Sequence, residues 1–108
     1  MLRTIKKFLS RSINKDINYK TATKLLKENN GVLLDVRSKQ EYEETHLPGA
    51  INISLYDLKK EVIKNIPDKS KFIIVYCSCG SRSKQAQNLL EQLNYQNVYN
   101  LKNGINAV

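Results

Sequence analysis

The sequence predicts an α/β fold, in which a small, mostly parallel β-sheet is flanked by helices on both faces. Apolar runs of strand length alternate along the chain with segments of helical periodicity. This alternation is typical of parallel sheets whose strands are joined by helices. The two clearest strands are VLLDV at 32–36 and FIIVY at 72–76, both rich in β-branched residues. A length of 108 residues suits one domain and leaves no room for a second.

Turn signals and spacing predict the elements before the FIIVY strand. Asn18 is expected to cap a helix over 19–28, with Gly31 ending it. The other elements expected in this half are, in chain order, the strand at 32–36, a short helix at 39–44, a turn at Pro48-Gly49, a strand at 50–53 and a helix at 55–66 that Pro67 ends.

One helix and one strand are expected after FIIVY. Apolar residues recur at helical spacing from Ala86 to Leu93, which predicts a helix over 83–93. NVYNL at 97–101 is expected to form the last strand. We therefore assign residues 16–108 to a single domain.

Residues 1–15 are expected to form a basic N-terminal arm or a short helix outside that domain. They contain five basic residues and no acidic one, and so supply five of the eight net positive charges. They lack the continuous apolar stretch of a secretory signal. We expect a solvated or packed arm and a cytoplasmic protein. A membrane-surface helix and an organelle transit peptide stay open as alternatives.

Composition argues against several functional classes. From residue 16 onward there are thirteen basic and ten acidic residues, so the net charge of this part is only +3. It shows no basic face of the kind that binds nucleic acid. Cys77 and Cys79 are too close in sequence to staple distant parts of a fold. His46 is the single histidine, so a four-ligand Cys/His zinc site cannot form. We expect no metal, no cofactor and no nucleic-acid partner, and a chemical role for cysteine in a reducing compartment.

The segment 77–83, CSCGSRS, joins the FIIVY strand to the next helix. Ligands bind outside the carboxyl ends of parallel strands, so this place predicts a site. Small residues and Gly80 allow successive backbone N–H groups to converge on an anion, and the helix N-terminus adds further donors. These donors are expected to lower the pKa of Cys77 and to favour its reactive thiolate.

The charges around this segment also predict an anion site. No acidic residue lies between Asp68 and Glu91. Arg82 and Lys84 stand near the first turn of a helix, where the dipole disfavours cations. We expect these two cations to face an anionic substrate.

Three segments resemble the rhodanese-like domain family. CSCGSRS at 77–83 is similar to its active-site loop, with Cys, two residues, Gly, one residue and Arg. LLDVRSKQEYEETHLPGAINI at 33–53 is similar to its second signature, and NVYNLKNGI at 97–105 resembles its closing strand and turn. The resemblance covers about residues 16–107 in the family's order. It implies a rhodanese-like fold and a single-domain sulfurtransferase.

The resemblance also implies a mechanism and a set of site residues. Cys77 would take a sulfur atom from a donor such as thiosulfate as a persulfide and pass it to a thiol, cyanide or sulfite. Arg82 would bind the donor anion. The implied partners are a small anionic sulfur donor and a small or protein thiol, such as glutathione or thioredoxin. The substrate-binding residues implied by the loop are Ser78, Cys79, Gly80, Ser81, Arg82 and Ser83.

Other readings of the loop stay open. Dual-specificity phosphatases and arsenate reductases have a similar loop with one more residue, and the four residues between Cys77 and Arg82 favour sulfur over phosphate. A non-catalytic docking or redox-sensing module is the alternative from another class. Cys79 either resolves a Cys77 persulfide or is a small side chain without a redox role.

Arg37 is a further candidate, because it follows Asp35 at the carboxyl end of a strand. It is expected either to contact the anion or to pair with Glu41. The acidic residues of the 39–44 helix are read as a solvated face rather than a catalytic one: Glu41, Glu43 and Glu44.

Several positions depart from the family's pattern or invite a catalytic reading. His46 is read as part of a structural turn rather than as a base for Cys77. Thr45 stands where a glycine is frequent, and Asn103 and Val108 replace a frequent second glycine and a terminal tryptophan. These departures bear on how the site is closed, not on the nucleophile.

Overall fold

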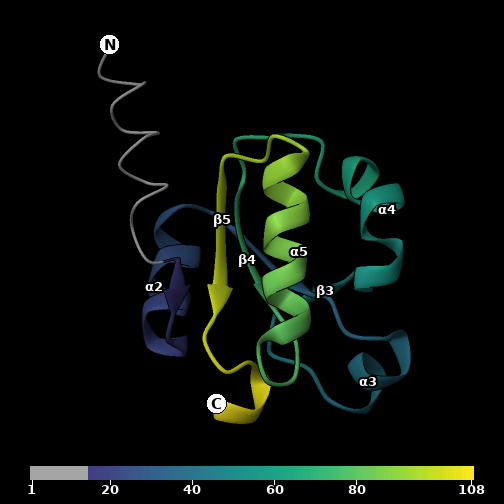
Figure 1. Cartoon of the computed structure of the whole chain (residues 1–108). Helices are drawn as coiled ribbons and strands as arrows, with labels where there is room; N and C mark the ends of the chain where they lie inside the picture. The colour runs from purple at the N-terminus through teal and green to yellow at the C-terminus, as the bar shows by residue number, and fades with distance from the viewer. Residues whose placement is uncertain (1–14) are drawn as a thin grey trace.

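The computed structural model describes residues 15–108, and its centre is a five-stranded sheet in which every neighbouring pair of strands is parallel. The strand order is β1-β5-β4-β2-β3 (Figure 1). The α/β fold and the parallel sheet expected from the sequence are confirmed. The strands are β1 (Asp16–Ile17), β2 (Val32–Asp35), β3 (Ile51–Asn52), β4 (Phe72–Tyr76) and β5 (Asn97–Leu101).

Helices cover both faces of this sheet. Helix α2 lies on one face, and α4 and α5 lie on the other (Figure 1). Each face has its own apolar core, because a buried strand turns alternate side chains to opposite sides. The helical elements are α2 (Tyr19–Glu28), α3 (Lys39–Glu44), η1 (Leu55–Asp57), α4 (Leu58–Asn65), α5 (Ser81–Gln92) and η2 (Ile105–Ala107).

The alternation along β4 decides where the cysteine points. Ile73 and Val75 belong to the core under α4 and α5, whereas Ile74 and Tyr76 belong to the core under α2. The next residue, Cys77, returns to the α4 and α5 side and is buried there. The strand therefore delivers the thiol to the edge of the core beneath α5.

Some element boundaries differ from those expected. Asn18 caps α2 as expected, by accepting a hydrogen bond from the Thr21 amide at 2.8 Å. The left-handed residue after α2 is Asn30 (φ 49°), whereas Gly31 was expected to end the helix. Asparagine tolerates this conformation because its short side chain can bond locally.

The other differences concern the helices on the second face. Helix α5 begins at Ser81, two residues before the expected start. The helix expected over 55–66 is divided into η1 and α4, because the Ser54 hydroxyl accepts a hydrogen bond from the Asp57 amide and closes a tight first turn.

The basic N-terminal arm expected at 1–15 lies outside the described residues except for Lys15. That lysine forms an ion pair of 2.7 Å with Glu91 on α5. Within residues 15–108, no helix has both the length and the apolar character needed to span a membrane.

Candidate active site

The loop between β4 and α5 folds back on the Cys77 sulfur. Gly80 has φ 111° and ψ −15°, a left-handed conformation that favours glycine. The turn aims the Gly80 amide at Cys77, and its N–H donates to Sγ across 3.1 Å. The loop thus provides a backbone donor for a negative charge on sulfur.

Ser83 gives this sulfur a second polar neighbour. Its Oγ lies 3.4 Å from the Cys77 Sγ and donates a hydrogen bond of 3.0 Å to the Gly80 carbonyl. A hydroxyl carries one proton, so it cannot donate to both partners at once. With that proton on the carbonyl, the Cys77 thiol donates to Ser83. When the hydroxyl turns towards the sulfur instead, it donates to Cys77 and favours the thiolate.

These contacts shift the acidity of Cys77. Burial is the largest single influence and raises the pKa of the thiol. Hydrogen bonds from the Ser83 hydroxyl and from the amides of Ser83, Gly80 and Cys79 together outweigh burial, so the pKa of Cys77 lies below its ordinary value. The thiolate fraction at neutral pH is correspondingly larger than for a free cysteine.

Arg82 closes the loop, but its guanidinium is already paired with a carboxylate. Its Nη1 and Nη2 bond to the two Glu41 carboxylate oxygens at 2.7 and 2.9 Å. Nη2 also donates to the Ser78 hydroxyl at 3.2 Å. This bidentate geometry is the strongest form of an arginine–carboxylate pair.

Glu41 is itself held in place by the start of α3. It forms a capping box with Ser38, in which each residue's side chain accepts from the other's amide at 3.1–3.2 Å. The Arg82 guanidinium, followed by the Ser38 amide, holds the pKa of Glu41 at about 2 despite an opposing effect of burial. The carboxylate is therefore charged throughout the physiological range.

The expected roles of two charged residues need correction. Glu41 is not part of a solvated face, because it binds the loop arginine. Lys84 does not face the loop, because its ammonium pairs with Asp16 of β1 at 2.7 Å. The acidic partners come from other parts of the chain, so the local absence of acids between Asp68 and Glu91 misled the prediction.

Arg37 does not pair with Glu41 and is not brought into the loop. Its guanidinium is buried and binds Asp35 at 2.8 Å and the Thr45 carbonyl at 2.6 Å. It also lies 5.7 Å from the ring centre of Tyr76, a residue of the core under α2. Cys77 belongs to the opposite core, so the sheet separates Arg37 from the sulfur.

His46 and Cys79 both lie at the surface. His46 is exposed, stacks on Tyr42 at 3.8 Å and contacts the Tyr42 carbonyl through Nδ1 at 2.8 Å, which agrees with a role in a turn. The Cys79 side chain is exposed, while that of Cys77 is buried. Within residues 15–108, no cluster of His, Cys, Asp and Glu side chains has the composition to hold a metal ion.

The C-terminal turn packs against the loop through backbone hydrogen bonds, a contact that was not among those predicted from the sequence. The amides of Ile105 and Asn106 donate to the carbonyls of Cys77 and Ser78 at 2.9 and 3.0 Å. Gly104 (φ 65°, ψ −163°) permits this approach, since a Cβ there would lie 2.4 Å from both carbonyl oxygens. The Asn103-Gly104 pair is the turn signal that could have indicated it.

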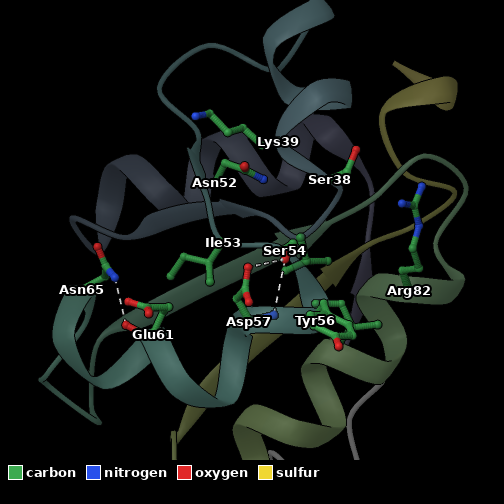
Figure 2. A pocket seen from close by; sticks show the side chains of 12 residues that line it. Ser38, Lys39, Asn52, Ile53, Ser54, Tyr56, Asp57, Glu61, Asn65 and Arg82 are labelled. Carbon is green, nitrogen blue, oxygen red and sulfur yellow. Dashed lines mark hydrogen bonds between the residues drawn. The ribbon is translucent and has the colours of Figure 1, made fainter.

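A cavity of about 660 Å³ opens beside the loop (Figure 2). Its walls are the start of α3, the segment from β3 into η1, and α4, with Arg82 at one side. Val36 and Ile53 provide an apolar floor. Because Asp35 pairs with Tyr76 across the sheet, the following residues Val36 and Cys77 are neighbours, and the cavity adjoins the loop.

Residues 18–108 match the rhodanese-like domain family. The chain belongs to that family. The expectation drawn from the three sequence segments is thereby confirmed.

Individual rhodanese-like relatives carry activity names. Thiosulfate sulfurtransferase PspE of Escherichia coli (strain K12) is 39% identical over 67 residues, which are 62% of this chain and 64% of PspE, so the match spans less than two thirds of that relative. Thiosulfate sulfurtransferase GlpE of Coxiella burnetii is 37% identical over 91 residues, 83% of this chain and 82% of GlpE. A solved structure described as a rhodanese with anions from E. coli has a TM-score of 0.66 at 33% identity. The match covers 72% of this chain and 91% of the E. coli chain.

The departures from the rhodanese-like pattern are accommodated locally. Thr45 has φ −164°, an extended conformation open to any residue, and its carbonyl accepts from Arg37. Asn103 adopts φ 62°, which asparagine tolerates better than most residues. The C-terminal turn therefore closes on the loop without the frequent second glycine.

The ion pair on Arg82 leads to a first prediction. Glu41→Gln removes the carboxylate that neutralises Arg82, so we expect tighter binding of an anionic donor and a further fall in the pKa of Cys77. A partly exposed pair of this kind is worth up to about 1 kcal/mol, or roughly a fivefold decrease in the KM for thiosulfate. Steady-state kinetics at low and high salt measure the effect, which salt should weaken.

Glu44→Gln is the matched control, because Glu44 lies on the same helix and is exposed, and no ion pair within residues 15–108 involves it. It should leave KM unchanged. A KM that rises in Glu41→Gln would mean that Glu41 aids donor binding by orienting Arg82 rather than opposing it by neutralisation.

Proposed function

We propose that this protein is a rhodanese-type sulfurtransferase that carries sulfur as a persulfide on Cys77. The observation that carries the proposal is the Cys77 sulfur itself, which accepts from the Gly80 amide within a loop closed by Arg82. Lowering of the Cys77 pKa by these donors supports its use as a nucleophile. The names of PspE and GlpE support the same chemistry.

The proposed reaction has two balanced half-reactions. The Cys77 thiolate attacks the outer sulfur of thiosulfate, the sulfur–sulfur bond of the donor breaks, and sulfite leaves with the bonding electrons. The Cys77 persulfide then gives its outer sulfur to a thiolate or to cyanide, which releases an organic persulfide or thiocyanate and restores the thiolate. No external oxidant or reductant is needed.

Three groups around the sulfur have distinct proposed roles. The amides of residues 78–83 stabilise the anionic persulfide. The Ser83 hydroxyl turns from the Gly80 carbonyl to the charged sulfur. Arg82 exchanges its bond to Glu41 for one to the donor anion. The chemistry needs a reduced cysteine, so we propose the cytoplasm as its setting.

Intact-mass measurement after incubation with thiosulfate tests the proposal. We expect the protein to gain one sulfur atom, and cyanide to remove it with formation of thiocyanate. A protein first blocked at its thiols with iodoacetamide is the control and should gain nothing.

Failure to gain sulfur from either thiosulfate or polysulfide would overturn the proposal in favour of a docking or redox-sensing module. Hydrolysis of a simple phosphoester by the unblocked protein would instead favour a phosphatase.

A further inference from the structure

The net positive charge of the chain is concentrated in the part that ends with α2. Residues 1–28 contain eight basic and two acidic residues, and so hold six of the eight net positive charges. Of the two acids, Asp16 is bound by the Lys84 ammonium at 2.7 Å, and Glu28 is the last residue of α2. Such a charge asymmetry is typical of chains that contact an anionic surface.

Helix α2 turns a row of lysines away from the protein. Its buried side is marked by Ala22, and Leu26 packs on the same core. At about 100° per residue, three lysines fall within about 60° of one another on the opposite side of the helix. All three are exposed, and no ion pair within residues 15–108 involves them. This α2 lysine row consists of Lys20, Lys24 and Lys27.

The row is unfavourable for the helix by itself. Lys20 and Lys24 are four residues apart and Lys27 is three further on, and side chains at these spacings are neighbours, so like charges repel. Glu28 follows Lys24 at the same spacing but forms no ion pair with it. An external anionic surface would neutralise all three charges together.

The segment before the row adds both positive charge and apolar side chains. Residues 1–15 contain five basic residues and no acidic one, and only three residues separate this segment from α2. Four aliphatic residues recur in it at intervals of three and four, the spacing of segments that bury one apolar face in a membrane interface. They are Leu2, Ile5, Leu9 and Ile13. The α2 lysine row has no aromatic side chain among its lysines, unlike the stacking surfaces that bind nucleic acid.

We propose that the α2 lysine row and the segment before it bind the surface of an anionic lipid membrane. Lipid phosphates lie against the row, and the aliphatic residues of the segment enter the interface. Cys77 belongs to the core under α4 and α5, on the other face of the sheet from α2, so the active-site loop stays accessible from water (Figure 1). Anionic lipids are abundant in cytoplasmic leaflets, which agrees with the proposed setting. The inference does not depend on sulfur transfer.

Sedimentation with lipid vesicles tests the proposal. We expect the protein to bind vesicles of phosphatidylcholine mixed with phosphatidylglycerol, to bind phosphatidylcholine alone much less, and to be released by salt. Each lysine near an anionic leaflet strengthens binding about fivefold. Combining Lys20→Gln, Lys24→Gln and Lys27→Gln should therefore weaken binding to the mixed vesicles about a hundredfold.

A matched triple variant on α4 separates the row from net charge. Lys59→Gln, Lys60→Gln and Lys64→Gln remove the same charge from exposed lysines that form no ion pair within residues 15–108. This variant should bind the mixed vesicles at least tenfold more tightly than the α2 variant. Equal binding by the two variants would overturn the proposal. Absence of vesicle binding by the wild-type protein, or binding of duplex RNA in its place, would also overturn it.

Two further measurements test the apolar contact and the orientation. Leu9→Gln keeps the charge and should weaken binding severalfold, whereas unchanged binding would overturn the part assigned to the N-terminal segment. Alkylation of Cys77 by iodoacetamide should proceed at the same rate with and without mixed vesicles. A rate that falls on the vesicles would overturn the assignment of the contact to the α2 face. Sulfur loading from thiosulfate is measured separately, and its failure would overturn the proposed function but not membrane binding.

Discussion

Replacing Cys77 with serine is expected to abolish sulfur transfer while the protein stays folded. A serine hydroxyl is not ionised at neutral pH and cannot form a persulfide, so activity should fall at least about 10³-fold. Serine can still accept the Gly80 N–H that now reaches the sulfur at 3.1 Å. We therefore expect a stability change within about 2 kcal/mol. Thiocyanate formation and thermal unfolding measure the two effects.

Cys79→Ser is the matched comparison, because the Cys79 side chain is exposed and the change keeps its backbone amide. Persulfide formation should survive in this variant. If Cys79→Ser lost sulfur uptake while Cys77→Ser kept it, the nucleophile would be Cys79 and not Cys77. A persulfide that discharges as sulfide only when Cys79 is present would assign Cys79 the resolving role.

Alkylation of the wild-type protein adds a pH test of the same cysteine. Donors from Ser83 and the loop amides lower the pKa of Cys77 against the opposing effect of burial. The rate of Cys77 alkylation should therefore reach its plateau at a lower pH than that of a free cysteine. Mass spectrometry of the Cys77 peptide follows the rate.

The position of this cysteine could be predicted because its signals are local. FIIVY is unmistakable as a buried strand, and the small residues that follow it indicate a turn into a helix. The parallel sheet then places the segment at the carboxyl edge, where ligands bind. Each of these steps needs only neighbouring residues or the alternation of elements.

The ionic partners of the loop could not be predicted in the same way. Arg82 and Glu41 are 41 positions apart, and Lys84 and Asp16 are 68 positions apart. Sequence windows around the loop contain neither acid, so they suggested free cations facing a substrate. Both pairs depend on how α3 and β1 are placed in space, which local propensities do not specify.

Arg37 illustrates a different limit. The sequence places Arg37 at the correct edge of the sheet. The register between β2 and β4 decides on which face of the sheet its side chain lies. In the observed register Asp35 pairs with Tyr76, and both turn towards α2. Side chains alternate along a strand, so Arg37 shares that face while Cys77 takes the other. A shift of one residue would have reversed the result.

Gly104→Ala is expected to have the largest effect on stability of any substitution considered. The added Cβ would lie 2.4 Å from the Cys77 and Ser78 carbonyl oxygens, and these are backbone atoms that cannot rotate away. The conformation, φ 65° and ψ −163°, is itself nearly restricted to glycine. We expect a loss of about 3 kcal/mol or more in the free energy of unfolding, measured by chemical denaturation.

Gly49→Ala separates strain from collision. Gly49 also has a positive φ of 80°, but nothing lies within 4 Å of the position that its Cβ would take. Its substitution should cost only about 1 kcal/mol, the strain of the left-handed backbone alone. The difference between the two alanine variants measures the close approach of the C-terminal turn to the active-site loop.

Activity then distinguishes a general loss of stability from a displaced loop. Under conditions where Gly104→Ala is still folded, a collision with the Cys77 and Ser78 carbonyls must move the loop or break the hydrogen bonds from Ile105 and Asn106. The Gly80 N–H would then no longer be aimed at the sulfur, so Cys77 alkylation at neutral pH should slow at least severalfold, while Gly49→Ala should keep the wild-type rate. If the folded Gly104→Ala protein instead alkylates at the wild-type rate, the C-terminal turn contributes stability without positioning the nucleophile, and the loop holds its geometry through Gly80 and Ser83 alone.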